Sequence, residues 1–255
     1  MITTLLPNPV KVKLEKGEPS CGIMVVEFFT PGLCQLAASA GLEFLIFDTE
    51  HSAVGIDTIK QQIAYARGTG IVPMVRVAAC ERYLVATMLD AGAMGIMVPM
   101  VETGEQAEQL ASWCRFPPEG TRGLAFGISH DDYTEGDPRE KMRWENARTL
   151  VMPIIETAKG IDNVDAILAA PGVDLAWLGD LDLSASYGVT NDFGAPAYKE
   201  ARERFIAAAK RHGKIIGGVS MSQNHGTVLD EGFRCLLLGS DVQMFKSALR
   251  SRVLI

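Results

Sequence analysis

The sequence predicts an α/β protein folded as a single-domain (β/α)8 TIM barrel. Eight short apolar runs alternate with eight helical stretches at a spacing of roughly thirty residues. The length of 255 residues matches the roughly 250 residues typical of such barrels. An open doubly wound sheet would give the same alternation, but no GxGxxG follows the first run. No linker or change of composition divides the chain, so we expect one domain over residues 1–255.

The predicted strands are apolar runs short enough to be buried in a parallel sheet. They cover 22–26, 44–47, 72–75, 95–98, 150–155, 175–178, 215–219 and 235–238. The predicted helices have apolar residues at three- and four-residue spacing, as Ile56, Ile59 and Ile63 illustrate, and Gly41 suits the left-handed residue that ends the first of them. They cover 31–40, 56–67, 82–91, 105–114, 159–170, 197–212, 223–231 and 242–252, with a polar helix over 10–17 before the first strand.

One connection is unusually long. Residues 115–146 contain the sequence RFPPEGTRG and many charged residues. Connections longer than about 15 residues are commonly lids or other functional segments. We therefore expect this segment to form a loop over the mouth of the barrel.

Composition excludes several classes of protein. The net charge is -7 and no cluster of Lys or Arg occurs, so nucleic acid is not an expected partner. The first residues lack the order of a signal peptide, and no run approaches about 18 apolar residues, so we expect a cytoplasmic protein without membrane association. The five cysteines form no CxxC pair and are odd in number, which argues against disulfides or a zinc knuckle.

Charged residues stand where several predicted strands end, which is where barrels place their chemistry. They are Asp48 and His51 after the second strand, Arg76 at the end of the third, Glu156 after the fifth and Asp182 past the sixth. Such groups are costly to bury unless they are paired or bind a ligand. Their convergence predicts an active site.

Glu156 and Asp182 are candidate metal ligands. They offer oxygen atoms alone, with no Cys or His close to them in sequence, which favours Mg²⁺ or Mn²⁺, with Co²⁺ or Zn²⁺ as alternatives. Two protein ligands would leave coordination positions for water and a chelating 2-oxo acid. Each acid could instead be structural, with Thr157 or Asp182 itself capping the helix that follows.

His51 and Arg76 are candidate catalytic residues, although each also has a purely structural interpretation. Asp48, three residues before His51, could orient the imidazole and hold its tautomer, as a general base requires. Arg76 could bind a carboxylate or an enolate oxygen with its guanidinium fork. It could equally form a structural ion pair with Asp48 or Glu50.

Five linked motifs occur in order between about Gly22 and Gly188. They are FDTEH, VRV followed by LDAGAMGIMVPMV, FPPEGTRG, IIETAKGIDNVDAI and LGDLDLSASYG. Together they resemble the HpcH/HpaI family of metal-dependent, class II pyruvate aldolases. The resemblance implies a TIM barrel that assembles as a hexamer, a trimer of dimers. It also implies a carbon–carbon lyase that reversibly cleaves a 4-hydroxy-2-oxo acid to pyruvate and an aldehyde.

The resemblance also implies roles for individual residues. His51 matches the catalytic histidine, Asp48 its partner and Arg76 the arginine that holds pyruvate. Glu156 and Asp182 match the metal ligands.

Three further positions follow from the same resemblance. The main chain around Gly179, Leu181 and Asp182 would bind the substrate carboxylate. Asp90 matches an acid that could contribute to the site of a neighbouring subunit.

The sequence departs from the family pattern near the predicted site. Ile154 replaces a glutamine two residues before the metal-binding glutamate, and Asp180 and Leu181 replace Pro-Ala before Asp182. The tryptophan common after the first strand is missing from 24–29. Asp180 could raise the pKa of a neighbouring acid, bind a second polar group, or turn outward.

The expected mechanism is cleavage of the C3–C4 bond. His51, directly or through a bound water, removes the proton of the C4 hydroxyl, and Arg76 and the metal stabilise the pyruvate enolate. A Schiff-base aldolase would need a lysine inside the barrel, whereas the ten lysines fall on helices or outside strand interiors.

Two other functions remain open at this point. A CoA-ester lyase of the citrate-lyase β type would need cationic phosphate contacts, for which Arg115 and Arg122 are candidates. A non-catalytic barrel that binds metal or a 2-oxo acid is the third reading. The last predicted helix is amphipathic and ends in Val253, Leu254 and Ile255, so we expect it to pack between subunits of a homo-oligomer.

Overall fold

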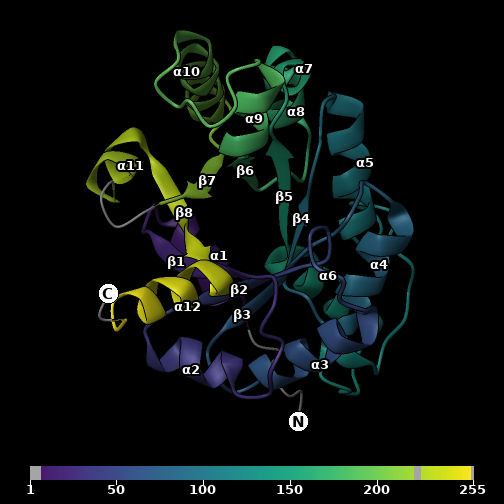
Figure 1. Cartoon of the computed structure of the whole chain (residues 1–255). Helices are drawn as coiled ribbons and strands as arrows, with labels where there is room; N and C mark the ends of the chain where they lie inside the picture. Colours follow the sequence, from purple (N-terminus) through teal and green to yellow (C-terminus); the bar gives the residue numbers. More distant parts are fainter. Residues whose placement is uncertain (1–6, 221–224, 254–255) are drawn as a thin grey trace.

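The structure, a computed structural model, describes residues 7–220 and 225–253. Eight parallel strands form one closed barrel in sequential order, as Figure 1 shows. The strands are β1 (Ser20–Val25), β2 (Phe44–Asp48), β3 (Val72–Arg76), β4 (Gly95–Val98), β5 (Leu150–Ile155), β6 (Leu175–Leu178), β7 (Ile215–Val219) and β8 (Phe233–Ser240). The predicted barrel is confirmed, and β8 is longer at both ends than expected.

Helices surround the strands, and the short helix α1 packs against the residues that fill the barrel interior. They are α1 (Pro9–Glu15), α2 (Leu33–Ser39), α3 (Ile56–Ala66), α4 (Arg82–Ala91), α5 (Gly104–Cys114), η1 (Ser129–Asp131), α6 (Pro138–Arg148), α7 (Ala158–Asp162), α8 (Val164–Ala169), α9 (Asp180–Ser186), α10 (Pro196–Arg211), α11 (His225–Glu231) and α12 (Asp241–Arg250). The predicted helix 159–170 is divided at Asn163, whose side chain donates to the carbonyl of Glu102. Residues 223–224 of another predicted helix lie outside the described residues.

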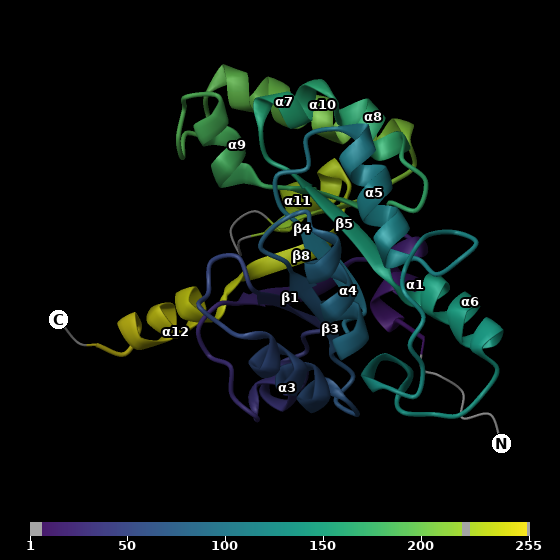
Figure 2. The same ribbon diagram turned by 90° about the vertical axis from the view of Figure 1, so that its right-hand side faces the viewer.

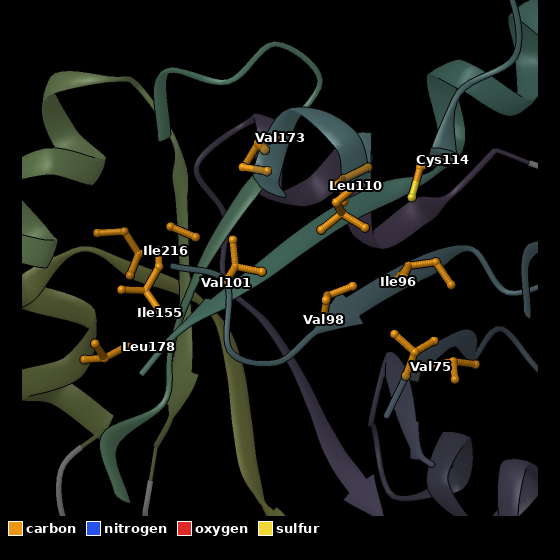
Figure 3. Packing of buried hydrophobic residues seen from close by; sticks show 14 of the residues in the cluster. Val75, Ile96, Val98, Val101, Leu110, Cys114, Ile155, Val173, Leu178 and Ile216 are labelled. Atoms are coloured by element: carbon orange, nitrogen blue, oxygen red, sulfur yellow. The ribbon is translucent and has the colours of Figure 1, made fainter. Parts of the chain in front are cut away.

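Two hydrophobic layers follow from the alternation of side chains along each strand. One layer lies between the strands and the outer helices, where Val75, Ile96, Val98, Ile155 and Leu178 pack (Figure 3). The other fills the barrel interior and includes Phe44, Ile46, Met74, Met152 and Trp177, with Val10 and Leu14 of α1 packing against it. The inward-facing positions that come next on β2, β3, β5 and β6 carry the predicted site residues.

The long connection does not cover the mouth of the barrel, so that expectation is wrong. Residues 115–146 join the end of α5 to the start of β5, and both lie toward the amino-terminal ends of the strands (Figure 2). Arg115 pairs with Asp174, just before β6, at 2.7 Å. The segment also contains η1 and most of α6, so much of it is helical and packed. A connection from a helix back to a strand must run on the face opposite the active site.

Helix α12 projects from the barrel (Figure 2). The buried carboxylate of Asp241 accepts the backbone N–H groups of Val26, Glu27 and Phe28, which anchors the start of the helix. Beyond this anchor the apolar residues Phe245 and Leu249 are about half exposed. Leu254 and Ile255, part of the predicted apolar tip, lie outside the described residues. No helix in the described ranges has the length and hydrophobicity needed to cross a membrane.

Candidate active site

Strand register brings the predicted residues to one place. Asp48 and Arg76 are direct neighbours on β2 and β3, each two residues beyond an inward-facing core side chain. Glu156 follows the last residue of β5, and Gly179 follows the last residue of β6. Their order along the strands therefore puts an arginine and several carboxylates at the carboxyl-terminal mouth of the barrel.

Asp48 holds Arg76 instead of the imidazole of His51. Its carboxylate is fully buried and accepts two bonds from the guanidinium, from Nε at 2.8 Å and from Nη2 at 2.7 Å. It also accepts the backbone N–H groups of Glu50 at 2.9 Å and His51 at 3.3 Å. Burial alone would lower the pKa of Arg76, but the bonds to Asp48 and the charge of Glu50 raise it. The expected contact between Asp48 and the ring is thus replaced by one with the backbone, because Arg76 is the nearer inward-facing partner.

Glu50 is the acid beside the imidazole. Its Oε2 lies 3.7 Å from Nε2 of His51 and 3.4 Å from Nη1 of Arg76. Burial and the charges of Asp48 and Asp182 raise the pKa of Glu50, against the opposing effects of Arg76 and His51. Sequence reasoning placed Glu50 only as an alternative partner of Arg76. Its position directly before the histidine in the DTEH sequence is the signal that could have identified it.

The side chain of His51 is 63% exposed, so it is open to a substrate in the mouth of the barrel. Its backbone N–H is fixed by Asp48, and its ring nitrogen faces Glu50. A solvent-accessible imidazole next to an acid can accept a proton and keep the resulting charge balanced. The geometry therefore allows a general base at His51.

Glu156 is a buried carboxylate in an unfavourable environment. Its residue is 5% exposed, and Oε1 accepts the backbone N–H of Met100 at 2.7 Å. Burial, helped by the charges of Asp182 and Glu50, raises the pKa of Glu156 to about 7 against the opposing effects of the Met100 N–H and Arg76. A side chain at Gly179 would begin 2.5 Å from Oε2, so glycine is needed to leave room for the carboxylate. Met100 itself has a left-handed backbone with φ of 56°, which was not expected from the sequence.

Asp182 lies in the first turn of α9, where its exposed side chain is near enough to Glu156 and Glu50 to raise both pKa values. Within the described ranges no three His, Cys, Asp or Glu side chains gather closely enough to hold a metal by themselves. Glu156 and Asp182 nevertheless supply two oxygen donors, and the acids around them outnumber the one guanidinium of Arg76. This donor set fits a divalent cation that takes its other ligands from water and substrate.

The main chain at the start of α9 also fits an anion. Gly179 is the N-cap and offers no side chain to the first-turn N–H groups of the helix. The N–H of Gly179 donates to the carbonyl of Ile155 at 3.2 Å. Gly179 therefore contributes space rather than a donor, while Leu181 and Asp182 lie in the turn that carries the remaining amides.

The departures from the family pattern have visible structural consequences. Ile154 is 2% exposed, faces the barrel interior and pairs in register with Trp177, so an apolar floor lies below Glu156. Asp180 turns away from Glu156 and accepts a hydrogen bond from the hydroxyl of Tyr198 on α10. Burial and the charge of Glu231 raise the pKa of Asp180, against the bond from Tyr198 and the charge of Arg202. Of the three roles considered for Asp180, the structure selects a bond to a second polar group.

Asp90 does not join the other site residues within one chain. It lies on α4, where its carboxylate accepts a bond from Arg122 at 3.0 Å. Both residues line a surface depression of about 500 Å³ together with Tyr83 and Leu124. A role for Asp90 in the site would therefore require a second subunit.

Neither the Schiff-base mechanism nor the CoA-ester reading gains support from the geometry. The buried lysines of the described chain, Lys11 and Lys141, pair with Asp174 and Asp131. The arginines considered for CoA phosphates are also buried, with Arg115 bound to Asp174 and Arg122 to Asp90 and Glu145. Their charges are already compensated inside the protein.

Comparison with known proteins gives a consistent picture. The model of the HpcH/HpaI aldolase/citrate lyase family matches residues 23–248. The chain is 31% identical to 5-keto-4-deoxy-D-glucarate aldolase of Klebsiella pneumoniae, over 97% of this chain and 96% of that protein. It is 32% identical to hydroxypyruvate/pyruvate aldolase of Roseobacter denitrificans, over 93% and 92% of the two chains.

A solved structure extends the similarity to the fold. The HpcH/HpaI aldolase from Desulfitobacterium hafniense superposes with a TM-score of 0.91 at 29% identity, covering 95% of this chain and 94% of that one. The expected enzyme class, an aldolase-type lyase, is confirmed by these relatives. The chain belongs to the HpcH/HpaI aldolase/citrate lyase family.

Proposed function

We propose that this aldolase cleaves a 4-hydroxy-2-oxo acid to pyruvate and an aldehyde, with Mg²⁺ or Mn²⁺ held by Glu156 and Asp182. One observation carries the proposal. Glu156 is buried, and burial together with the charges of Asp182 and Glu50 raises its pKa to about 7; among the described residues, Arg76 is the guanidinium that opposes this shift. A divalent cation would compensate this excess of negative charge. When bound, such a cation polarises the 2-oxo group and stabilises negative charge that develops on its oxygen.

The side chain of Arg76 is positioned for the same negative charge. Asp48 fixes the guanidinium through Nε and Nη2, and Glu50 contacts Nη1, so its orientation is set before a substrate binds. Such preorganised donors stabilise a developing oxyanion without a cost of rearrangement. The amides in the first turn of α9 would bind the substrate carboxylate, since the N-cap Gly179 leaves them without a side-chain partner.

His51 would act as the base. Its imidazole accepts the proton of the C4 hydroxyl, the C4–O bond becomes a carbonyl, and the C3–C4 bond breaks. The electron pair of that bond moves into the 2-oxo group to give the enolate of pyruvate, which is then protonated at C3. Glu50, 3.7 Å from Nε2, balances the positive charge of the protonated ring.

The test is exchange of the methyl protons of pyruvate in deuterated buffer, followed by proton NMR. We expect loss of the methyl signal with Mg²⁺ and wild-type protein, and no loss with Glu156→Ala or after chelation. Glu102→Ala is the matched control, since Glu102 is another acid of this rim but pairs outward with Lys159. Metal-independent exchange, or exchange that persists in Glu156→Ala, would refute the assignment. Absence of exchange from the wild-type protein with any metal would favour a non-catalytic barrel.

We also propose that the chain forms a cytoplasmic homo-oligomer, a hexamer built as a trimer of dimers, with α12 packed between subunits. The exposed Phe245 and Leu249 support this, since α12 projects from its own barrel (Figure 2). Asp90 would then contribute to the site of a neighbouring subunit. Light scattering tests the assembly, and a monomer at micromolar concentration would refute it. The free cysteines of the described chain fit a reducing compartment.

A further inference from the structure

The short helix α9 carries two aspartates that face different surroundings. Asp180 is its first residue and Asp182 its third. Residues two apart in a helix are rotated by about 200°, so the two side chains leave the first turn on nearly opposite sides. The carboxylate of Asp182 is near enough to Glu156 for its charge to be felt there, whereas Asp180 accepts a hydrogen bond from the hydroxyl of Tyr198. Helix α9 therefore stands between the proposed metal site and α10.

The partner of Asp180 is firmly held. Tyr198 is 4% exposed, and its ring lies 5.2 Å from that of Phe193. One turn further along α10, Arg202 pairs with Glu231 of α11 at 2.6 Å, and its guanidinium lies 4.9 Å from the ring centroid of Phe233 on β8. Tyr198 is thus a buried side chain on a helix that Arg202 ties to the body of the barrel.

Helix α9 depends on contacts with its surroundings. It has seven residues and no side-chain cap at Gly179, and helices this short have little stability of their own. Leu183 anchors its middle in the hydrophobic layer, and the Ser186 hydroxyl accepts the N–H of Ala158 near its end. In the first turn, from which Asp182 projects, the N–H of Gly179 donates to Ile155 and the Ser184 hydroxyl donates to the carbonyl of Leu181. The bond from Tyr198 to Asp180 adds a side-chain link between this turn and α10.

We propose that Asp180 is a positioning residue: its bond with Tyr198 fixes the first turn of α9 and so directs the Asp182 carboxylate toward the metal. The inference rests on the proposed function, because it assumes that Asp182 binds a divalent cation. Asp180 itself touches neither metal nor substrate. The competing explanation is simple attraction, in which the negative charge of Asp180 raises the affinity for any nearby cation.

Substitutions at the two ends of this bond separate the explanations. Tyr198→Phe removes the hydroxyl and changes no charge, so we expect the dissociation constant for Mn²⁺ to rise about tenfold, as for other groups that orient metal ligands. Asp180→Asn removes the charge but keeps an acceptor oxygen, and should stay within about twofold of wild type. Asp180→Ala should match Tyr198→Phe. Tyr187→Phe, which removes the hydroxyl of the tyrosine that ends α9, is the matched control and should change nothing.

The measurement is the concentration of free Mn²⁺ by electron paramagnetic resonance, with purified protein and no substrate. Unchanged affinity in Tyr198→Phe together with equal weakening in both Asp180 variants would overturn the inference in favour of attraction. Unchanged affinity in all variants, with only a lower melting temperature, would overturn it in favour of a structural role. A wild-type protein that binds no Mn²⁺ would overturn the proposed metal site itself, and the wild-type measurement distinguishes that failure from the other two.

Discussion

Two buried glutamates in this protein have pKa values that are shifted in opposite directions. Glu145 on α6 is 2% exposed and Glu156 at the mouth of the barrel is 5% exposed. Burial raises the pKa of both, but His130, Arg148 and Arg122 surround Glu145 and bring its pKa below the ordinary value. Glu156 has other acids as neighbours, and its pKa rises to about 7. The negative charge of Glu145 is compensated by cationic side chains of the chain itself, whereas that of Glu156 would need a positive charge from a ligand.

The difference separates charges that stabilise the fold from charges that serve the reaction. Around Glu145, one Nη atom of Arg148 lies 2.5 Å from the carboxylate and the Nδ1 of His130 lies at 3.4 Å. Around Glu156, the hydrogen bond comes from a backbone N–H of a residue with a left-handed backbone. An arrangement that is electrostatically unfavourable without a ligand is typical of a functional site.

The largest expected effect of a substitution at the mouth is on activity, at His51. We expect His51→Asn to reduce aldol cleavage by about 10²–10⁴-fold, the usual contribution of a general base. The ring is 63% exposed, so the free energy of unfolding should stay within about 0.5 kcal/mol of wild type. Steady-state kinetics and urea denaturation check the two parts. A loss in the free energy of unfolding of several kcal/mol, comparable to the loss in transition-state stabilisation, would show that His51 has a structural role.

At the ion-pair cluster around Glu145, the expected effect is on the free energy of unfolding. Glu145→Gln leaves Arg122 and Arg148 without their shared carboxylate, and breaking such a buried pair costs about 3–5 kcal/mol. Because the pKa of Glu145 is lowered in the folded state, this loss should be full at pH 7 and shrink as the pH falls below the ordinary glutamate value. Urea denaturation at several pH values measures it. A loss that grows as the pH falls would contradict the account.

The equivalent substitution at the mouth of the barrel, Glu156→Gln, should raise the free energy of unfolding instead of lowering it. In metal-free protein at pH 8, Glu156→Gln removes a carboxylate whose ionisation is costly, so stability should rise by up to about 3 kcal/mol. The folded-state pKa is raised, so the wild-type protein loses this stability as the pH rises from about 4.5 to about 7. Below that window the two proteins should be equally stable. Destabilisation at pH 8 would show that Glu156 is paired within the chain.

The smallest effect concerns the backbone that supports Glu156. Met100 has φ of 56° and a side chain that is half exposed. Met100→Gly should relieve this conformation and raise stability by up to about 1 kcal/mol, with the N–H donor to Glu156 retained. Thermal unfolding measures the change, and Met244→Gly at the exposed helix α12 should be destabilising instead. Equal destabilisation in both would contradict strain at Met100.

The sequence allowed the fold to be predicted, and strand ends indicated which charged residues meet at the mouth, but it left open whether Asp48 pairs with Arg76 or with His51. Strand alternation and barrel topology are enough to bring Asp48, Arg76 and Glu156 to one end. Whether Asp48 binds Arg76 or His51 depends on which side chain lies opposite in register, and three-residue spacing along the chain does not report this. The roles of Glu50 and Met100 arise from loops whose backbone angles have no periodic pattern.

The wrong prediction that residues 115–146 cover the mouth of the barrel has a similar cause. The length and charge of residues 115–146 indicated a lid, but many of these charges form internal pairs such as Lys141 with Asp131. A run of charged residues looks the same in sequence whether it is solvated or paired. Asp180 could be read in three ways because its direction depends on Tyr198, 18 positions later.

The most direct test is a crystal grown with Mn²⁺ and pyruvate, with anomalous scattering used to locate the metal. We predict a peak about 2.0–2.3 Å from a carboxylate oxygen of both Glu156 and Asp182, with pyruvate completing the coordination and Arg76 within hydrogen-bond distance of it. A peak at another position, or none at saturating Mn²⁺, would contradict the conclusion that the unbalanced carboxylates at the mouth of the barrel form the metal site.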